Sequence, residues 1–351
     1  MLQGNHTLIL SPRRWGKSSL VERVVNIIDK KHKPYRTVVI DLFTVGSEKE
    51  FLEIFAREVL KAASDKWEER IRDAKELFKA IIPKISLGPD PFTEFSISFD
   101  LEELKKHNDE ILNLPETLAI KKGIKLIICL DEFQNLSSFP EYELLEKKMR
   151  AIWQRQKSVT YCLYGSKRHM MEEIFDNPSK PFYRFGDMMM LPKIEQSKWV
   201  DYIVKSFEAS GKLIDENTAS KIPVAMKNHS WYVQQLSNYT WNLTNKKATS
   251  QDVQKALEEV IQTNSPLFQK EIESLSTTQV NMLKAVSKGE FQLTSTHVMT
   301  VYSLGTPNNV IKNKRSLIER DIILELEKGY EFADPVFELW FRNIFFGVDY
   351  V

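Results

Sequence analysis

The sequence has few cysteines and no long apolar run. Cys129 and Cys162 are the only cysteines among 351 residues, and each lies in an apolar segment rich in strand-forming residues. They provide no disulfide framework, so we expect two small buried side chains in a reducing compartment. No apolar run approaches the ~20 residues that a membrane helix needs, and the first ten residues lack the basic segment of a signal peptide. A cytoplasmic protein is therefore expected.

An excess of charge is also absent. The 49 basic and 48 acidic residues give a formal net charge of +1. Because a nucleic-acid-binding domain usually carries a strongly basic surface, any contact with DNA or RNA would depend on a local patch. The six histidines are scattered and adjoin no cysteine cluster, which disfavours a structural zinc site. The length and the ordinary hydrophobic content predict two or three globular domains.

Residues 1–192 alternate strand-like and helix-like patterns. Buried strands are expected at 7–10, 37–43, 126–130, 159–164 and 188–191, and helices directly after the first strand and at 48–82, 101–121 and 142–156. Such alternation predicts an α/β fold in which a parallel sheet is covered by helices on both faces. The mixed segment 88–99 is expected to be an insertion or a hairpin.

The remaining sequence predicts two further regions. Residues 193–268 lack strands and fit a helical lid with helices at 195–210, 215–226, 230–243 and 250–262, the last with Ser250 as its N-cap. Residues 269–351 predict helices at 276–286, 296–303 and 307–320, then a hairpin at 322–332 that turns at Lys328-Gly329. Three helices followed by a hairpin are typical of a winged helix-turn-helix domain.

A phosphate-binding loop is expected between the first strand and the helix after it. Ser11–Ser18 fits the pattern G-x-x-x-x-G-K-[ST] except at its first position, where Ser11 replaces glycine. Backbone N–H groups of such a loop hold phosphate oxygens, Lys17 would reach the β and γ phosphates, and the Ser18 hydroxyl would ligate Mg²⁺. The nucleotide-binding residues are thus predicted to be Ser11, Pro12, Arg13, Arg14, Trp15, Gly16, Lys17, Ser18 and Ser19. The alternative is a glycine turn that caps a helix.

A second motif lies at the end of the predicted strand 126–130. The apolar run from Leu126 to Leu130 leads directly into Asp131 and Glu132. In a P-loop ATPase the first of two such acids binds Mg²⁺ and the second polarises the water that attacks the γ-phosphate. We assign these roles to Asp131 and Glu132. The alternative is an ordinary strand that leads into an acidic turn. For the site to be absent, however, this alternative and the helix-capping alternative for the loop would both have to be true.

Two further residues are candidates for catalysis. Ser166 follows the predicted strand 159–164, where P-loop ATPases place a sensor of the γ-phosphate; it is also suited to be the N-cap of a following helix, and both readings are compatible. Arg184 precedes the predicted strand 188–191 and is a candidate for neutralising transition-state charge, in cis or from a neighbouring subunit. The alternative for Arg184 is a surface ion pair.

These motifs, in this order, resemble the archaeal-type P-loop ATPase family of the AAA+/STAND group. The likeness rests on S-P-R-R-W-G-K-S-S (11–19), L-P-E-T-L-A (114–119), L-D-E-F-Q (130–134), Y-G-S (164–166) and D-P-V-F-E-L-W-F-R (334–342). It implies ATP bound at 11–19, magnesium at Ser18 and Asp131, a catalytic Glu132 and a sensor at Ser166. Relatives often carry Gly-x-Pro in the lid, where this chain has His229-Ser230-Trp231-Tyr232.

The third helix of the predicted winged helix suggests an output. It carries polar side chains suited to a DNA groove or to phosphates, namely Asn308, Asn309, Lys312, Asn313 and Arg315, while Val310, Ile311, Leu317 and Ile318 are expected on its buried side. The alternative is a winged helix that binds protein, since acidic residues at 319, 321, 325 and 327 dilute its charge. Trp340, Phe341, Phe345 and Phe346 are expected in the core.

Two functions follow from these motifs. The first is an ATPase switch that hydrolyses ATP with Mg²⁺ and signals through the winged helix to DNA or to a protein partner. The second is a DNA-binding regulator whose nucleotide site no longer hydrolyses. The second is favoured by Ser11 and by the lid departure, and opposed by the intact Lys17, Ser18, Asp131 and Glu132. No guanine-reading N-K-x-D motif stands at a suitable place, which favours ATP over GTP.

Overall fold

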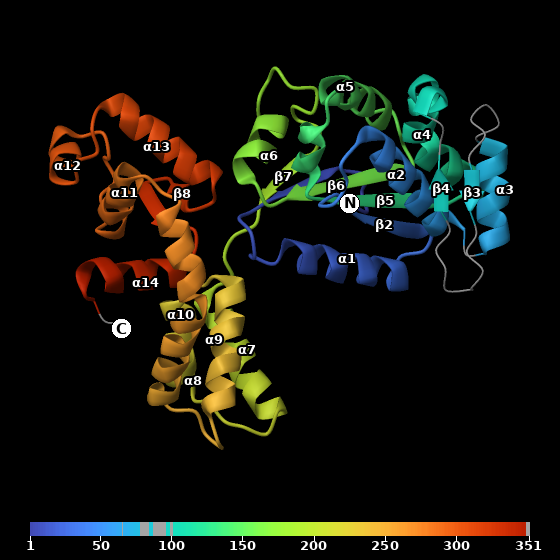
Figure 1. Cartoon of the computed structure of the whole chain (residues 1–351). Coiled ribbons are helices and arrows are strands. Elements are labelled where there is room, and N and C mark those ends of the chain that lie inside the picture. Colours follow the sequence, from blue (N-terminus) through green and yellow to red (C-terminus); the bar gives the residue numbers. More distant parts are fainter. Residues whose placement is uncertain (65, 78–83, 87–95, 99–100, 349–351) are drawn as a thin grey trace. The chain divides into compact units, whose positions relative to one another are not determined.

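The computed structural model of the chain describes residues 1–64, 66–77, 84–86, 96–98 and 101–348 (Figure 1). The chain divides into two compact units. The first consists of Met1–Arg13 and Lys17–Leu191, and the second of Arg14–Gly16 and Pro192–Val351. No helix among the described residues is long and apolar enough to cross a lipid bilayer.

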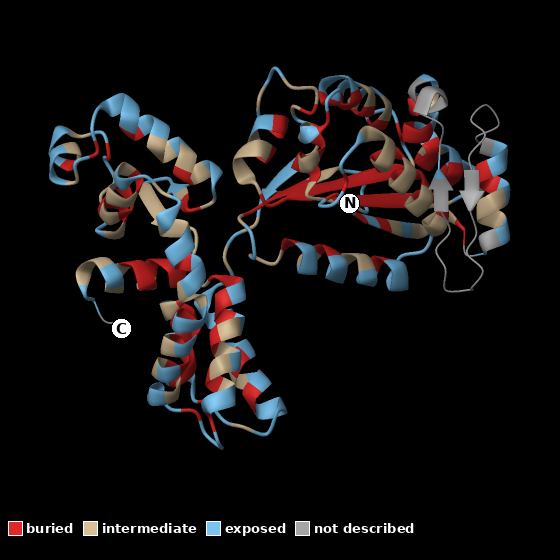
Figure 2. Ribbon diagram, in the orientation of Figure 1, coloured by how far each residue is buried: buried red, intermediate tan, exposed pale blue. Residues whose placement is uncertain are grey.

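A five-stranded parallel sheet forms the centre of the first unit. Its strands are β1 (Thr7–Leu10), β2 (Tyr35–Asp41), β5 (Lys125–Asp131), β6 (Val159–Gly165) and β7 (Asp187–Met190), in the order β2-β5-β6-β1-β7. All four neighbouring pairs run parallel. The three central strands β5, β6 and β1 are almost entirely buried and are drawn mostly in red in Figure 2. The predicted strands and their parallel arrangement are thus confirmed. The expected burial of the last strand is wrong, because all four residues of β7, at the edge of the sheet, are exposed.

Apolar residues of the strands alternate between the two faces of the sheet. Leu8, Leu10, Ile128 and Leu130 belong to the larger core, which also contains side chains of α2 (Glu48–Ala63), α4 (Leu101–Lys122) and α5 (Tyr142–Trp153). Ile9, Ile127, Cys129, Cys162 and Tyr164 belong to a smaller core against α1 (Lys17–Lys31). Helices therefore cover both faces, and both cysteines are buried and free, as the sequence predicts.

Several local predictions need correction or extension. The described residues of the segment 48–82 form two helices, α2 and α3 (Trp67–Leu77). The insertion or hairpin expected at 88–99 lies outside the described residues except for β4 (Ser96–Ser98), which pairs antiparallel with β3 (Lys84–Ser86). The 3₁₀-helix η1 (Phe133–Ser138) was not predicted, and the helix that could follow Ser166 is α6 (Arg168–Phe175). The expected N-cap at Ser166 is wrong, because the N-cap of α6 is Lys167.

The helical part of the second unit follows the predicted pattern with one difference. It contains α7 (Gln196–Ala209), α8 (Glu216–Ala225), α9 (Ser230–Leu243) and α10 (Ser250–Glu273). The N-cap of α10 is Thr249 and not Ser250, because Thr249 and Asp252 form a capping box with reciprocal side-chain-to-backbone bonds. The helix also runs to Glu273, well beyond the predicted end at 262, and includes Pro266.

The last part of the second unit contains the elements of a winged helix. They are α11 (Thr277–Ser287), α12 (Thr296–Val301), α13 (Pro307–Glu319) and the antiparallel pair of β8 (Ile323–Leu326) and β9 (Gly329–Phe332), followed by α14 (Pro335–Phe346). Its apolar side chains share one core with those of α7–α10. Because α10 crosses the boundary predicted at residue 268, the helical region and the winged helix share one helix and one core.

The motif D-P-V-F-E joins the two parts of the second unit. Asp334 caps α14 by accepting hydrogen bonds from the backbone N–H groups of Val336 (2.9 Å) and Phe337 (3.0 Å). The same carboxylate accepts a hydrogen bond from the hydroxyl of Tyr232 on α9, and Glu338 forms an ion pair with Lys227 after α8. Burial raises the pKa of Asp334. The expected core position of Trp340 and Phe341 is confirmed, while Phe345 and Phe346 pack partly buried against the same core.

Candidate nucleotide-binding site

The order of the strands brings the three predicted motifs to one edge of the sheet. β6 lies between β1 and β5, and all three strands run in the same direction. The loop after β1, the acids after β5 and Ser166 after β6 therefore leave the sheet at the same end. In open parallel sheets this carboxyl edge is where ligands bind.

The loop between β1 and α1 has the backbone conformation of a tight turn. Gly16 has φ +98° and Arg14 has φ +63°. A side chain at the Gly16 position would be strained, because L-residues rarely adopt such a φ. This requirement explains why glycine directly precedes Lys17, which begins α1. Of the remaining loop residues, Arg13, Arg14, Ser18 and Ser19 are exposed.

The ammonium group of Lys17 is held inside the loop. Lys17 is 6% exposed, and its Nζ donates hydrogen bonds to the backbone oxygens of Ser11 (2.8 Å) and Pro12 (3.0 Å) and to Ser11 Oγ (3.2 Å). Ser11, which replaces the usual glycine, is fully buried, and its hydroxyl provides a side-chain acceptor that glycine would lack. The positive charge lies within the turn where phosphate oxygens would be bound.

The two predicted magnesium ligands are in direct contact. Ser18 Oγ donates a hydrogen bond of 2.8 Å to Asp131 Oδ2. Burial raises the pKa of Asp131, against the opposing effect of the hydrogen bonds from Ser18 and from the Glu132 N–H. Hydroxyl and carboxylate oxygens this close suit a hard cation such as Mg²⁺, which would hold the carboxylate ionised. The described residues include no cluster of three acidic, histidine or cysteine ligands.

Glu132 and Ser166 also contact each other. Glu132 Oε2 accepts hydrogen bonds from Ser166 Oγ (2.9 Å) and from the Ser166 backbone N–H (3.3 Å). Arg13 Nε donates to the same Ser166 hydroxyl at 3.3 Å. A continuous set of contacts therefore joins the loop, the end of β6 and the acid after β5.

Arg184 is not joined to this set by any contact between described residues. It is exposed, has φ +52°, and its guanidinium lies 5.1 Å from the ring centre of Tyr183. Among the described residues, Arg184 forms neither the surface ion pair nor a contact with the candidate site of the same chain. Its catalytic role stays a prediction.

Two residues near the site were not identified from the sequence. Asp41 ends β2 directly opposite Asp131 in the parallel register, and its charge contributes to the raised pKa of Asp131. Gln134, in the first turn of η1, donates from its amide to Glu132 Oε2. Asp41 could have been found, because it follows a buried strand as Asp131 does. The role of Gln134 depends on the turn of the chain after Glu132.

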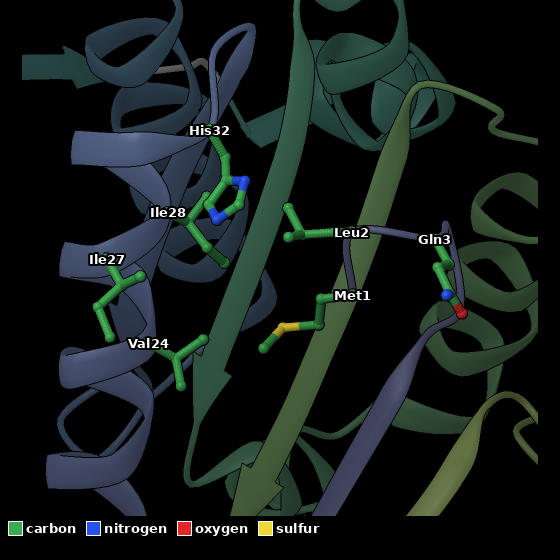
Figure 3. Close-up of a pocket in the computed structure, with 7 residues that line it drawn as sticks. All are labelled: Met1, Leu2, Gln3, Val24, Ile27, Ile28 and His32. Carbon is green, nitrogen blue, oxygen red and sulfur yellow. The ribbon is translucent and has the colours of Figure 1, made fainter.

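A pocket beside α1 is separate from the candidate site. A pocket of about 430 Å³ lies beside α1 and is lined by Met1, Leu2, Gln3, Val24, Ile27, Ile28 and His32 (Figure 3). None of these side chains belongs to the loop or to the acidic motif. The pocket lies along the second half of α1, whereas Lys17 and Ser18 stand at the beginning of that helix.

The winged helix presents most of its predicted contact residues to solvent. On α13, Asn308, Asn309, Lys312 and Arg315 are exposed, and Asn313 is half-buried. Arg315 pairs with Glu319 at 2.8 Å, and Lys314 with Glu325 at 3.4 Å. The prediction that Ile311 faces the core is wrong: it is 55% exposed, because Val310 and Leu317 fill the buried side of the helix.

Comparison with known proteins supports the fold. A family model described as a probable winged helix domain matches residues 266–343. The structure is similar to that of a Walker-type ATPase of Pyrococcus abyssi, with a TM-score of 0.67, 19% identity and coverage of 97% of this chain and 92% of that one. The chain has the fold of a P-loop ATPase with a C-terminal winged helix.

A second solved structure has a similar arrangement. The ORC2 protein of Aeropyrum pernix, solved in complexes with ADPNP and ADP, superposes with a TM-score of 0.56 at 14% identity, covering 98% of this chain and 89% of that one. No curated protein matches the sequence. At these identities the likeness shows the fold alone.

Proposed function

We propose that this chain is a magnesium-dependent ATPase that acts as a nucleotide-controlled switch. The proposal is carried by the contact between Ser18 Oγ and Asp131 Oδ2 at 2.8 Å. These two residues are far apart in sequence, and they meet beside the buried Lys17 at the edge of the sheet where Glu132 also lies. An ordinary helix-capping turn would need neither a buried lysine nor this contact.

Each residue has a distinct task in this proposal. The loop N–H groups and Lys17 bind the β and γ phosphates of ATP, and Lys17 exchanges its loop acceptors for phosphate oxygens. Ser18 and Asp131 hold Mg²⁺, which neutralises charge on the phosphates. Glu132 orients a water molecule for in-line attack on the γ-phosphate and accepts its proton. Ser166, hydrogen-bonded to Glu132, is the residue that would detect the γ-phosphate.

Turnover and binding of ATP test these assignments. The wild-type protein should bind and hydrolyse ATP only with Mg²⁺. Lys17→Ala should abolish binding, because the phosphates lose their main cationic partner, whereas Glu132→Gln should bind ATP and hydrolyse it at least about 100-fold more slowly. If the wild type neither binds nor hydrolyses ATP, the switch proposal is wrong.

The proposed output is the exposed face of α13, toward DNA or a protein partner. DNA contact is favoured by the exposed Asn308, Asn309, Lys312 and Arg315, and the exposed Ile311 is compatible with a protein partner. Double-stranded DNA binding should be measured at two salt concentrations for the wild type and for Lys312→Ala/Arg315→Ala. Weaker binding with a smaller salt slope supports phosphate contacts.

An alternative output is a DNA-binding regulator with a nucleotide site that does not hydrolyse. It would be favoured by DNA binding that persists unchanged in Lys17→Ala and by no turnover in the wild type. A protein partner would be indicated if the wild type binds no DNA at low salt.

A further inference from the structure

Gln134 is a buried polar residue beside the candidate general base. It is 1% exposed and lies in the first turn of η1, two residues after Glu132. Its Nε2 donates a hydrogen bond to Glu132 Oε2. Together with the hydroxyl and the backbone N–H of Ser166, three donors converge on this one carboxylate oxygen.

The amide of Gln134 is only half satisfied. Its Oε1 is buried and has no hydrogen-bond partner among the described residues. The opposite orientation of the amide would place its oxygen against the Glu132 carboxylate, so the donor has to face Glu132. A buried unpaired oxygen destabilises the fold, and an apolar side chain of the same shape would avoid that loss. The presence of an amide at this buried position therefore points to a use for its donor.

The neighbouring strand leaves room for this side chain. Gly165 ends β6, and a Cβ at that position would lie 1.9 Å from Gln134 Oε1 and 3.0 Å from its Cδ. Any side chain larger than hydrogen at position 165 would displace the amide from Glu132. Gly165 in Y-G-S and Gln134 in L-D-E-F-Q therefore lie directly against each other, although they are 31 positions apart in sequence.

The orientation of Glu132 needs such support. Its backbone is left-handed, with φ +50° and ψ +41°, and its N–H donates to Asp131 Oδ1 at 2.8 Å. The backbone thereby turns away from β5, and a half-exposed glutamate side chain has several rotamers of similar energy. A general base acts only within hydrogen-bond reach of its water. With Oε2 occupied by three donors, Oε1 is the oxygen available to that water.

We propose that Gln134 is a positioning residue for ATP hydrolysis, because its amide fixes Oε2 of Glu132 and so directs Oε1 toward the attacking water. Gln134 itself touches neither phosphate nor water in this scheme. The inference rests on the proposed ATPase function.

Steady-state kinetics of Gln134→Met test the proposal. Methionine keeps the length and the burial of the side chain but has no N–H donor. We expect kcat for ATP to fall about 10- to 100-fold, as for a misoriented catalytic group, while KM stays unchanged. In the Glu132→Gln background, where ATP binding can be measured with little turnover, the added Gln134→Met change should leave the affinity for ATP unchanged. In the Glu132→Gln background the added Gln134→Met change should have no further effect on kcat, because both act through one group.

Gln156→Met is the matched control. Gln156 is also a buried glutamine of the first unit: its Nε2 donates to the Leu112 backbone oxygen at 3.1 Å and its Oε1 accepts from the Tyr161 hydroxyl at 2.8 Å. Loss of these bonds should lower the Tm and leave kcat unchanged.

Each outcome decides the proposal. A fall in kcat with constant KM, confined to the Gln134 variant and absent in the Glu132→Gln background, supports it. An unchanged or raised kcat overturns it, and so does an equal loss of kcat in both glutamine variants, which would indicate a structural role alone. Absence of turnover in the wild type overturns the proposed function and this inference with it.

Discussion

The close packing of Gly165 against Gln134 gives a quantitative prediction for Gly165→Ala. The added Cβ would lie 1.9 Å from Gln134 Oε1 and 3.1 Å from Met171 Sδ. Overpacking of a buried site costs about 1–3 kcal/mol. Displacement of the amide also removes its bond to the Glu132 carboxylate, and bonds to charged groups contribute about 1.5–3 kcal/mol. Because Glu132 is partly exposed and can be rehydrated, we expect a total loss of about 2–4 kcal/mol.

A double-mutant cycle identifies the source of this loss. In a Gln134→Ala background the main obstacle to the new methyl group is gone, and the flexible Met171 can move away. Gly165→Ala should then cost less than about 1 kcal/mol, which gives a coupling energy of about 1–3 kcal/mol between the two positions. Urea unfolding of the four proteins without nucleotide measures these values. The transition of the first unit has to be followed separately, because a two-unit chain need not unfold in one step. An equal cost of Gly165→Ala in both backgrounds would refute the reasoning.

Three further changes have expected outcomes. Gly186→Ala should lower the free energy of unfolding by about 1–3 kcal/mol, since its Cβ would lie 2.6 Å from the His6 backbone oxygen, whereas the control Gly46→Ala meets no atom closer than 3.8 Å and should leave the thermal midpoint unchanged or slightly raised. Burial lowers the pKa of His6 from 6.5 to about 4, so the unfolded chain binds the proton first and stability should fall as pH drops from about 6.5 to 4; thermal midpoints of wild type and His6→Asn across this window should converge at the acid end. Asp334→Ala removes the cap of α14 and should cost about 1–2 kcal/mol in urea unfolding, with most of the loss recovered in Asp334→Asn.

Local patterns predicted most of the elements, because each depends on neighbouring residues. The buried strands stand out as short apolar runs, and the capped helices of the second unit show the expected periodicity. Two helix boundaries differ for local physical reasons: Thr249 forms a capping box that Ser250 cannot form, and α10 continues past residue 262 because its later turns bury Phe268 in the shared core. The short α6 buries Met171, Ile174 and Phe175, a helical spacing that was present in the sequence but unassigned.

The sequence by itself determined which functional groups follow one another along the chain. The glycine before Lys17, the hydroxyl of Ser18 and the acids at the end of an apolar strand are local requirements, readable in order along the chain. The tertiary structure decided which of these groups meet. The insertion of β6 between β1 and β5 brings Ser166 between the loop and the acids, the parallel register sets Asp41 beside Asp131, and the turn after Glu132 brings Gln134 onto its carboxylate. These contacts depend on strand order and on the direction in which the chain leaves the sheet, which are properties of the packed core and not of any segment alone.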